Sequence, residues 1–326
     1  SQKVATLGGN VGENSGGPRC LRYGVTTNHV IGLQVILADG QILHLGSAAY
    51  DPSGYDLRGL LIGSEGTLAV VTEVTVRIMP TPEKVITQLA VYNDVADAAR
   101  SVAGIIAAGI VPATLEMMDA RIIQAVEDSY TCGYPRDAAA VLIIEVEGPA
   151  VGLEEQARDI RAICTANHCR EIRDAATAAE RNRLWEGRRG AFGAVARLAP
   201  SYLVCDGTVP RTKLPAALSA VRKVGQKYNL SVGNVFHAGD GNLHPLILFD
   251  DRSPEVIEKV HKAGMEILKI CVDLGGTISG EHGIGTEKLQ GMPLIFQDAD
   301  LGMMRNVKTA IDPKGVCNPG KVIPRA

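Results

Sequence analysis

The segment at 232–249 constrains the fold most, because two β-rich apolar runs flank the turn-forming tetrapeptide Gly-Asp-Gly-Asn at 239–242. This pattern predicts a β-hairpin. If the tetrapeptide makes the loop, His237 lies opposite His244, and both imidazoles stand on the same side of the ribbon with Cβ atoms about 5 Å apart. Two histidines held in this way form a ready pair of metal ligands.

A second cluster of candidate ligands lies in the glycine-rich segment 275–285, which contains Glu281 and His282. Two histidines and one carboxylate suit a divalent transition metal such as Zn²⁺, Mn²⁺ or Fe²⁺, so His237, His244 and Glu281 are the predicted metal ligands. Taken singly, a histidine in an apolar strand is more often a hydrogen-bonded core residue, and glycines beside it often mark only a tight turn. The occurrence of both clusters in one chain favours the metal site.

The composition is that of an ordinary globular protein. The chain has 326 residues, of which 46% are hydrophobic, and a net charge of −3. This length is sufficient for two domains. No excess of lysine and arginine and no basic stripe is present, so nucleic-acid binding is disfavoured. No apolar run reaches the ~20 residues that a membrane-spanning helix requires. The seven cysteines are scattered without CxxC spacing, which predicts a reduced, cytoplasmic setting.

Strand and helix patterns alternate along the chain. The first eighty residues contain much glycine, a hairpin at 30–45 and a β-branched run at 67–78, and Pro80 and Pro82 mark a boundary. Beyond it, the pattern predicts an α+β arrangement with helices on one face of a largely antiparallel sheet. The predicted strands lie at 85–91, 114–118, 139–147 and 202–205, and the predicted helices at 95–108, 153–166, 175–196, 214–228, 256–274 and 300–311.

Two glycine clusters, at 8–17 and 61–68, precede the β-rich parts of the first eighty residues. The first is too rich in glycine to predict any regular element, and its exposed backbone N–H groups could cradle a phosphate or a ring edge. Neither cluster has the order of glycines of a Rossmann fingerprint or a Walker loop. Either cluster alone could be a mere loop.

The chain carries five ordered segments that resemble the FAD-linked oxidases of the vanillyl-alcohol oxidase type: GGNVGENSGGPRCLRYGVT, LLIGSEGTLAVVTE, HAGDGNLHP, SGEHGIG and the closing NPGK. Within that family they look most similar to the flavin-bearing catalytic subunit of bacterial glycolate oxidases. The resemblance implies the second lobe of a PCMH-type FAD-binding domain over 1–82, a cap domain with an antiparallel sheet covered by helices over 83–312, and a tail at 313–326 returning to the FAD domain. Family members carry a further FAD-binding lobe ahead of this start, so the chain is expected to be a fragment.

FAD is the cofactor that the resemblance implies. The residues expected to bind it come from the two glycine clusters and the closing NPGK segment. They are Gly9, Asn10, Asn14, Gly16, Gly17, Gly63, Ser64, Glu65, Gly66 and Asn318.

The resemblance also implies a mechanism in which a 2-hydroxy acid passes its C2 hydrogen to flavin N5 and loses its hydroxyl proton. The metal would bind the hydroxyl and carboxylate oxygens and lower the hydroxyl pKa. His282 would accept the proton, and Asn242 would orient substrate or flavin. Arg188 is the expected anchor of the substrate carboxylate; Arg189 is the competitor, and an ordinary surface role is about as common for either.

The sequence narrows the class of substrate but does not identify one substrate. Phe192 and Val204 fall where relatives acting on longer dicarboxylates are expected to carry polar groups, which favours a short substrate. Glycolate, oxidised to glyoxylate, and D-lactate, oxidised to pyruvate, differ by one methyl group, worth only ~1–3 kcal/mol of discrimination. The sequence leaves both open.

No haem attachment site or cluster-binding cysteine pattern is present to take electrons from the flavin. The resemblance therefore implies an iron–sulfur subunit and a second flavoprotein-like subunit, with this chain at most peripheral to the inner membrane. Three alternatives remain: a D-lactate or D-2-hydroxyglutarate dehydrogenase, a non-catalytic scaffold subunit, and an inactive truncated fragment.

Overall fold

The computed structural model describes residues 5–48 and 54–325. Its contacts divide the chain into two compact units. The smaller unit comprises Ser1–Gly17, Tyr23–Pro80 and Ile278–Ala326, and the larger unit comprises Pro18–Arg22 and Thr81–Thr277. None of the helices in the described ranges is both long and apolar enough to span a membrane.

The larger unit is built on a nine-stranded sheet with the order β7-β4-β6-β5-β10-β11-β9, in which β12 also pairs with β10 and β8 pairs with β12. All its pairings are antiparallel, as the sequence predicts. The strands are β4 (Lys84–Tyr92), β5 (Thr114–Asp119), β6 (Ala140–Gly148), β7 (Glu171–Asp174), β8 (Ser201–Val204), β9 (Gly207–Thr208), β10 (Ser231–His237), β11 (Asn242–Leu243) and β12 (Pro245–Phe249).

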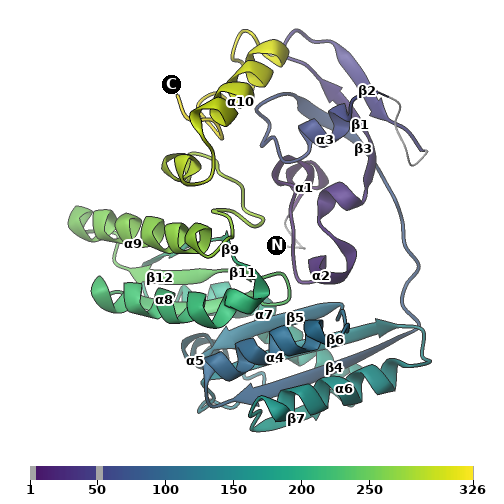
Figure 1. Cartoon of the computed structure of the whole chain (residues 1–326), viewed down its shortest axis with the longest axis vertical. Coiled ribbons are helices and arrows are strands. Elements are labelled where there is room, and N and C mark those ends of the chain that lie inside the picture. The colour runs from purple at the N-terminus through teal and green to yellow at the C-terminus, as the bar shows by residue number, and fades with distance from the viewer. Residues whose placement is uncertain (1–4, 49–53, 326) are drawn as a thin grey trace. The chain divides into compact units, whose positions relative to one another are not determined.

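Helices cover both faces of this sheet, so the expectation of helices on one face was wrong. The helices are α4 (Val95–Ala107), α5 (Ala120–Ser129), α6 (Leu153–Ala166), α7 (Ala178–Val195), α8 (Leu214–Lys227) and α9 (Pro254–Asp273) (Figure 1). Leu89 and Val91 of β4 pack with α5 and α7, whereas Ala90 and Tyr92 pack with α4, α6 and α8. Successive strand residues point to opposite faces, so a strand that is apolar at every position needs cover on both.

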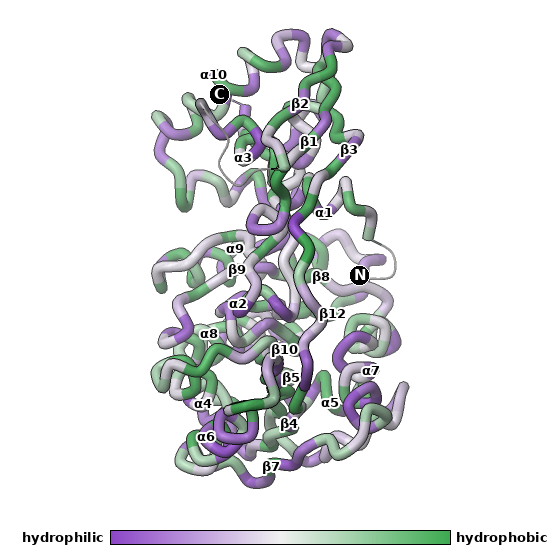
Figure 2. Tube along the Cα trace, turned by 90° about the vertical axis from the view of Figure 1, so that its right-hand side faces the viewer, coloured by the Kyte–Doolittle hydropathy of each residue, from purple (hydrophilic) through white to green (hydrophobic). Residues whose placement is uncertain are grey.

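The helices bury one stripe each. In α6 the buried residues are Leu153, Ala157, Ile160 and Cys164, spaced by three or four positions. This spacing places them on one side of the helix. Figure 2 colours the trace by hydropathy and shows hydrophobic and hydrophilic residues interspersed along the chain. Helix α5 was not predicted, although Asp119 caps it by accepting a hydrogen bond from the backbone N–H of Ile122.

The smaller unit holds a three-stranded antiparallel sheet of order β2-β1-β3. Its strands are β1 (Val30–Ile36), β2 (Ile42–Gly46) and β3 (Val70–Val76), and its helices are α1 (Leu7–Glu13), α3 (Leu57–Leu61) and α10 (Asp298–Ile311). Most of the short helix α2 (Cys20–Tyr23) is assigned to the larger unit. The predicted 30–45 hairpin is confirmed, since Ile36 pairs with Ile42 across the Asp-Gly turn.

Helix α1 corrects the expectation that the first glycine cluster forms no regular element. Thr6 caps its start by accepting a hydrogen bond from the backbone N–H of Gly9, and Asn14 ends it in the left-handed conformation. Val11 is completely buried in the core beneath. The capping hydrogen bonds and the burial of Val11 offset the low helix propensity of the glycines.

The contact units differ from the predicted domains mainly over 278–312, which the contacts place in the smaller unit. Val307 and Ile311 of α10 pack against the core that Leu33 and Val35 of β1 build. The predicted domain limits themselves stay a prediction.

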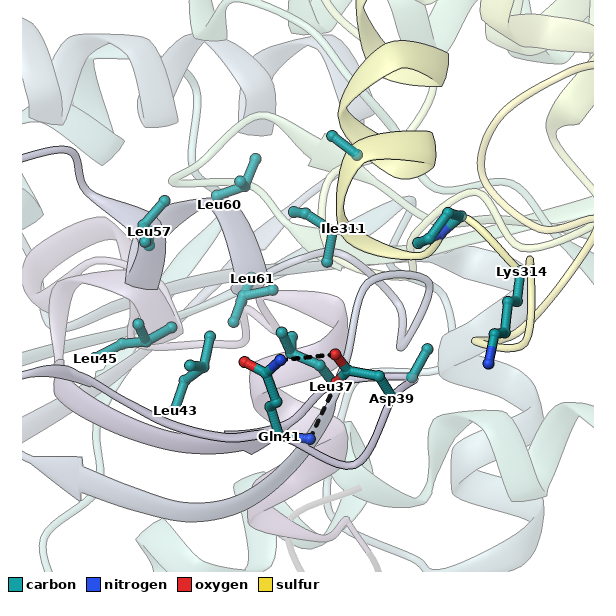
Figure 3. A pocket seen from close by; sticks show the side chains of 13 residues that line it. Leu37, Asp39, Gln41, Leu43, Leu45, Leu57, Leu60, Leu61, Ile311 and Lys314 are labelled. Atoms are coloured by element: carbon teal, nitrogen blue, oxygen red, sulfur yellow. Dashed lines mark hydrogen bonds between the residues drawn. The ribbon is translucent and has the colours of Figure 1, made fainter.

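An apolar pocket of about 340 Å³ lies in the smaller unit between β2, α3 and the end of α10 (Figure 3). At its rim Gln41 donates hydrogen bonds to the Asp39 carboxylate from both its backbone N–H and its side-chain amide. Six of the thirteen residues that line the pocket are leucines, and none of the thirteen is expected to bind FAD or a metal.

Candidate active site

The histidine hairpin forms, but its register differs from the prediction by two residues. His237 pairs with Asn242, and Asn234 pairs with Pro245, so His237 does not lie directly opposite His244. The strand residues alternate with period two, so a shift of two keeps each side chain on its original face. The imidazoles of His237 and His244 are therefore diagonal neighbours, with ring centroids 5.2 Å apart and planes at 83°.

Glu116 fixes the orientation of His237. The two residues face each other on the paired strands β5 and β10, and His237 Nδ1 lies 2.8 and 2.9 Å from the two carboxylate oxygens. Glu116 is 1% exposed. A proton on Nδ1 that is donated to this carboxylate leaves the Nε2 lone pair as the one that can coordinate a metal.

Arg188 of α7 binds the same carboxylate. Its Nε and Nη2 each lie 2.7 Å from Glu116 Oε2. Burial raises the pKa of the Glu116 carboxyl, but the charges of His237 and Arg188 and their hydrogen bonds outweigh it and hold the pKa below its ordinary range. Arg188 is buried, whereas Arg189 is exposed, so a surface role does not apply to Arg188.

His244 has a buried carboxylate and an aromatic ring beside it. Its Nε2 lies 3.5 Å from Asp206 Oδ1, and its ring centroid is 6.4 Å from that of Phe192. Asp206 is completely buried. The two imidazoles thus each have a carboxylate neighbour, Glu116 for His237 and Asp206 for His244.

Asn242 lies on β11 between its partners His237 on β10 and Thr208 on β9. It is 6% exposed, and its side-chain oxygen has no hydrogen-bond partner among the described residues. A buried amide oxygen without a donor is costly, so this atom is suited to receive a hydrogen bond from a ligand.

Neither Glu116 nor Asp206 was predicted from the sequence. Glu116 lies 121 positions before His237 and comes from a short apolar strand that gives no motif. The available signal was a single charged residue inside an otherwise apolar run, in Leu115–Met118 and again in Leu203–Gly207. Such a residue needs a buried partner.

Glu281 and His282 belong to the smaller unit, whereas His237 and His244 belong to the larger one. The loop that carries Glu281 and His282 is held within its own unit: Ser279 Oγ donates to the Gly283 carbonyl at 3.0 Å, and Lys288 donates to Ser279 Oγ at 3.1 Å. The assembly of His237, His244 and Glu281 around one metal stays a prediction.

The residues expected to bind FAD all lie in the smaller unit. The glycine and asparagine residues of the first cluster lie in α1 or directly after it, and those of the second cluster follow α3. At Gly17 and Gly66 the position that a Cβ would take faces open space. Three of the polar ones make contacts within the protein: Asn14 accepts from the Thr27 backbone, Asn318 donates to the Glu65 carbonyl, and the Glu65 carboxylate accepts from Ile284 and Gly285. Their cofactor role stays a prediction.

Comparison with known families matches residues 81–322 to "FAD linked oxidases, C-terminal domain" and residues 1–46 to "FAD binding domain". The chain belongs to the FAD-linked oxidase family. The resemblance inferred from the five sequence segments is thereby confirmed.

Curated relatives place the chain within this family. It is 46% identical over 99% of its length to the glycolate oxidase subunit GlcD of Escherichia coli K12, of which it covers 65%, and 43% identical to that of Bacillus subtilis, of which it covers 69%. A D-lactate dehydrogenase of Archaeoglobus fulgidus is 32% identical over 98% of the chain and 70% of that protein. The chain thus spans slightly less than two thirds of the E. coli relative.

Solved structures confirm the fold. The FAD-linked oxidase chain superposes with a TM-score of 0.74 on 4-ethylphenol oxidase from Gulosibacter chungangensis, at 15% identity over 98% of this chain and 71% of the other. p-Cresol methylhydroxylase gives the same TM-score at 14% identity over 95% and 68%. Both confirm the α+β arrangement predicted from the sequence.

Proposed function

We propose that this chain carries out the FAD-dependent oxidation of a short D-2-hydroxy acid, glycolate to glyoxylate or D-lactate to pyruvate. The observation that carries the proposal is the buried group of His237, His244, Glu116 and Arg188: one carboxylate holds the His237 imidazole and the Arg188 guanidinium, and the His244 imidazole lies beside that of His237. The identity of 46% to a glycolate oxidase subunit supports the substrate class.

A divalent metal fits the residues at this site. His237 and His244 offer imidazole nitrogens with neighbouring carboxylates that set ring orientation, which is the usual arrangement of metal-binding histidines. We assign Glu281 as the third ligand. Thr277, four residues before Glu281, exchanges backbone hydrogen bonds with Thr208, which pairs with Asn242. Four extended residues reach at most ~14 Å, so the chain tethers Glu281 to the hairpin.

FAD fits the smaller unit. Its two glycine-rich segments place backbone close to open space at Gly17 and Gly66, where a planar or anionic group can approach without meeting a side chain. When bound there, FAD supplies the acceptor for the two electrons and the C2 hydrogen of the substrate.

The protein's own residues would bind and deprotonate the substrate. Arg188 spends Nε and Nη2 on Glu116, so the N–H groups of Nη1 remain for the substrate carboxylate. Asn242 would accept a hydrogen bond from the substrate or the flavin through its side-chain oxygen. His282 is the proposed base that takes the hydroxyl proton. A metal on His237 and His244 would lower the pKa of that hydroxyl.

Phe192 supports a short substrate. It lies one helical turn after Arg188 on α7 and 6.4 Å from both His244 and Tyr202, ring to ring. Val204 is partly buried in the same cluster as Phe192. A phenylalanine and a valine at these positions offer no hydrogen bond to a second carboxylate.

The electrons would leave the flavin to an acceptor on another protein. The relatives of 43–46% identity are named as subunits of glycolate oxidase, which supports an assembly with further subunits. We propose an iron–sulfur subunit and a second flavoprotein-like subunit as those partners, with the chain cytoplasmic and peripheral to the inner membrane. The D-lactate dehydrogenase relatives keep D-lactate as the second candidate substrate.

The test is anaerobic reduction of the flavin. The purified chain is supplied with FAD and Mn²⁺ or Zn²⁺, then with glycolate or D-lactate, and the visible flavin band is followed. Bleaching is expected with a short D-2-hydroxy acid and is expected to disappear in His282→Ala. The matched control is His261→Ala, which removes an exposed histidine of α9 and should bleach normally. Bound FAD that no 2-hydroxy acid bleaches would contradict the proposal.

A further inference from the structure

The Glu65 carboxylate is bound to the loop that carries Glu281 and His282. Its Oε1 accepts a hydrogen bond from the Ile284 backbone N–H at 2.6 Å, and its Oε2 accepts one from the Gly285 backbone N–H at 2.7 Å. Both oxygens are therefore used on two successive amides. Such charge-assisted pairs are short, strong and directional.

The backbone of Glu65 is itself held rigidly. Its N–H donates to the Gly12 carbonyl at 2.8 Å, and its carbonyl accepts from the Asn318 side chain at 2.7 Å. Glu65 joins three parts of the smaller unit that are far apart in the sequence: the end of α1, the closing tail and the 279–285 loop.

Glu65 occupies a backbone conformation that favours glycine. Its φ is +52°, between Gly63 at +79° and Gly66 at +69°. A side chain in the left-handed region is unfavourable unless it makes compensating contacts. The two hydrogen bonds to Ile284 and Gly285 are such contacts.

The contacts of Glu65 act together with other hydrogen bonds of the loop. Ser279 bonds to the Gly283 carbonyl, and Val322 donates to the Gly285 carbonyl at 3.0 Å. Gly283 has φ of +79°, and a Cβ there would overlap Glu13 and Glu65. Ser279 therefore holds the loop before Ile284, and Glu65 holds it at Ile284 and Gly285, just after Glu281 and His282.

We propose that Glu65 is a positioning residue of the reaction: it sets the shape of the 279–285 loop and thereby the directions of Glu281 and His282. This inference rests on the proposed function for what Glu281 and His282 do. It replaces the expected cofactor role of Glu65, because both oxygens of its carboxylate are used on the loop that carries the proposed metal ligand and base.

The test compares Glu65→Gln with Glu13→Gln. In Glu65→Gln the side chain keeps one acceptor oxygen but turns an NH₂ group toward the second amide. Glu13 lies beside the same glycine, and the structure gives its Oε2 no hydrogen-bond partner among the described residues, so Glu13→Gln is a matched removal of one charge. Hydrogen exchange should show protection of the Ile284 and Gly285 amides in the wild type and in Glu13→Gln, and its loss in Glu65→Gln at the amide that faces the NH₂ group.

The consequence for the site is measured separately with the metal alone. Mn²⁺ affinity in Glu65→Gln is expected to fall ~10–100-fold, the range for groups that orient a ligand, with kcat for flavin reduction falling alongside while the Kd for FAD stays within about twofold. Loss of FAD affinity with unchanged Mn²⁺ affinity would instead make Glu65 a cofactor residue and overturn the inference.

Folding of the variants is checked by circular dichroism. If Glu65→Gln does not fold, Glu65→Asp keeps the charge but shortens the reach, and it should show the same loss of amide protection. Equal exchange at Ile284 and Gly285 in the wild type and in Glu65→Asp would overturn the inference. Exchange and metal binding need no substrate, so they stand even if no 2-hydroxy acid reduces the flavin, which would defeat only the proposed function.

Discussion

At the scale of single residues, the Glu116 carboxylate joins an imidazole and a guanidinium that are both buried. Replacing Glu116 by Gln would leave the Arg188 charge without its counterion, because an amide carries no negative charge. Breaking a buried pair in this way costs about 3 kcal/mol or more of unfolding free energy. Urea denaturation should show this loss, and Mn²⁺ affinity should fall ~10–100-fold as His237 loses its orienting acceptor.

The control for Glu116→Gln is the double variant Glu116→Gln/Arg188→Met. Removing the unpaired charge should restore a large part of the lost stability, but not the metal affinity. Equal stability of the single and double variants would contradict the ion-pair account.

Phe192 should limit the length of the substrate side chain. Phe192→Ala is expected to raise kcat/KM for 2-hydroxy acids with longer side chains, relative to glycolate, by ~10-fold or more, since each methylene accommodated is worth ~1–3 kcal/mol. Anaerobic flavin reduction across a series of chain lengths measures this ratio. Phe296→Ala, a partly buried phenylalanine of the smaller unit, serves as control. An unchanged ratio in Phe192→Ala would remove Phe192 from substrate selection.

The sequence predicts the histidine pair but not its carboxylates, for a physical reason. The side-chain direction of His237 and His244 depends only on strand parity, which survives the two-residue error in register. Glu116 and Asp206 reach the imidazoles through pairings of β5 with β10 and of β9 with β11. Such long-range pairings leave no local pattern, because they are decided by the packing of the whole sheet.

At the scale of elements, the strand and helix patterns predict most elements of the larger unit. Helices α1 and α5, which these patterns do not predict, begin at capping residues. Helix α1 forms through Thr6, Asn14 and the burial of Val11, which the glycine content conceals. The unbroken apolar runs at 89–92 in β4 and 140–144 in β6 carry the signal for a sheet covered on both faces. That signal is an absence of alternation.

The end of α10 gives a prediction about pH. Asp312 accepts hydrogen bonds from Lys308 and from the backbone N–H groups of Val316 and Cys317. The hydrogen bond from Lys308 makes the largest contribution to lowering the pKa of Asp312 from 3.8 to about 2. The two backbone amides lower this pKa further, and together these bonds outweigh burial, which raises it. Because the folded pKa lies below the unfolded one, this stabilisation is complete above pH 3.8 and is lost as the pH falls toward 2.

The comparison of wild type with Asp312→Asn measures this effect. Unfolding followed from about pH 5 down to about pH 2 should show the wild type more stable at the upper end and the two proteins converging at the lower end. A stability difference that does not depend on pH would show that the Asp312 charge is not what anchors the tail.

At the scale of the whole molecule, the proposed cofactors belong to different units. The residues expected to bind FAD lie in the smaller unit, whereas His237 and His244 lie in the larger one. Glu281 belongs to the smaller unit, whose last segment begins at Ile278. A ligand stabilises what it binds, by ~2.7 kcal/mol at a concentration of 100 times its Kd. FAD alone should therefore stabilise the smaller unit only.

A metal held by His237, His244 and Glu281 would bind residues of both units at once. Mn²⁺ is therefore expected to raise the unfolding temperatures of both units together in calorimetry, and His237→Ala and Glu281→Gln should each abolish the shift in both. If Mn²⁺ stabilises only the larger unit and Glu281→Gln leaves that shift intact, the third ligand comes from the larger unit, and Asp206 beside His244 becomes the group that completes the metal site. The same titration thus decides between one shared metal site and a site built entirely on the hairpin and its neighbouring strands.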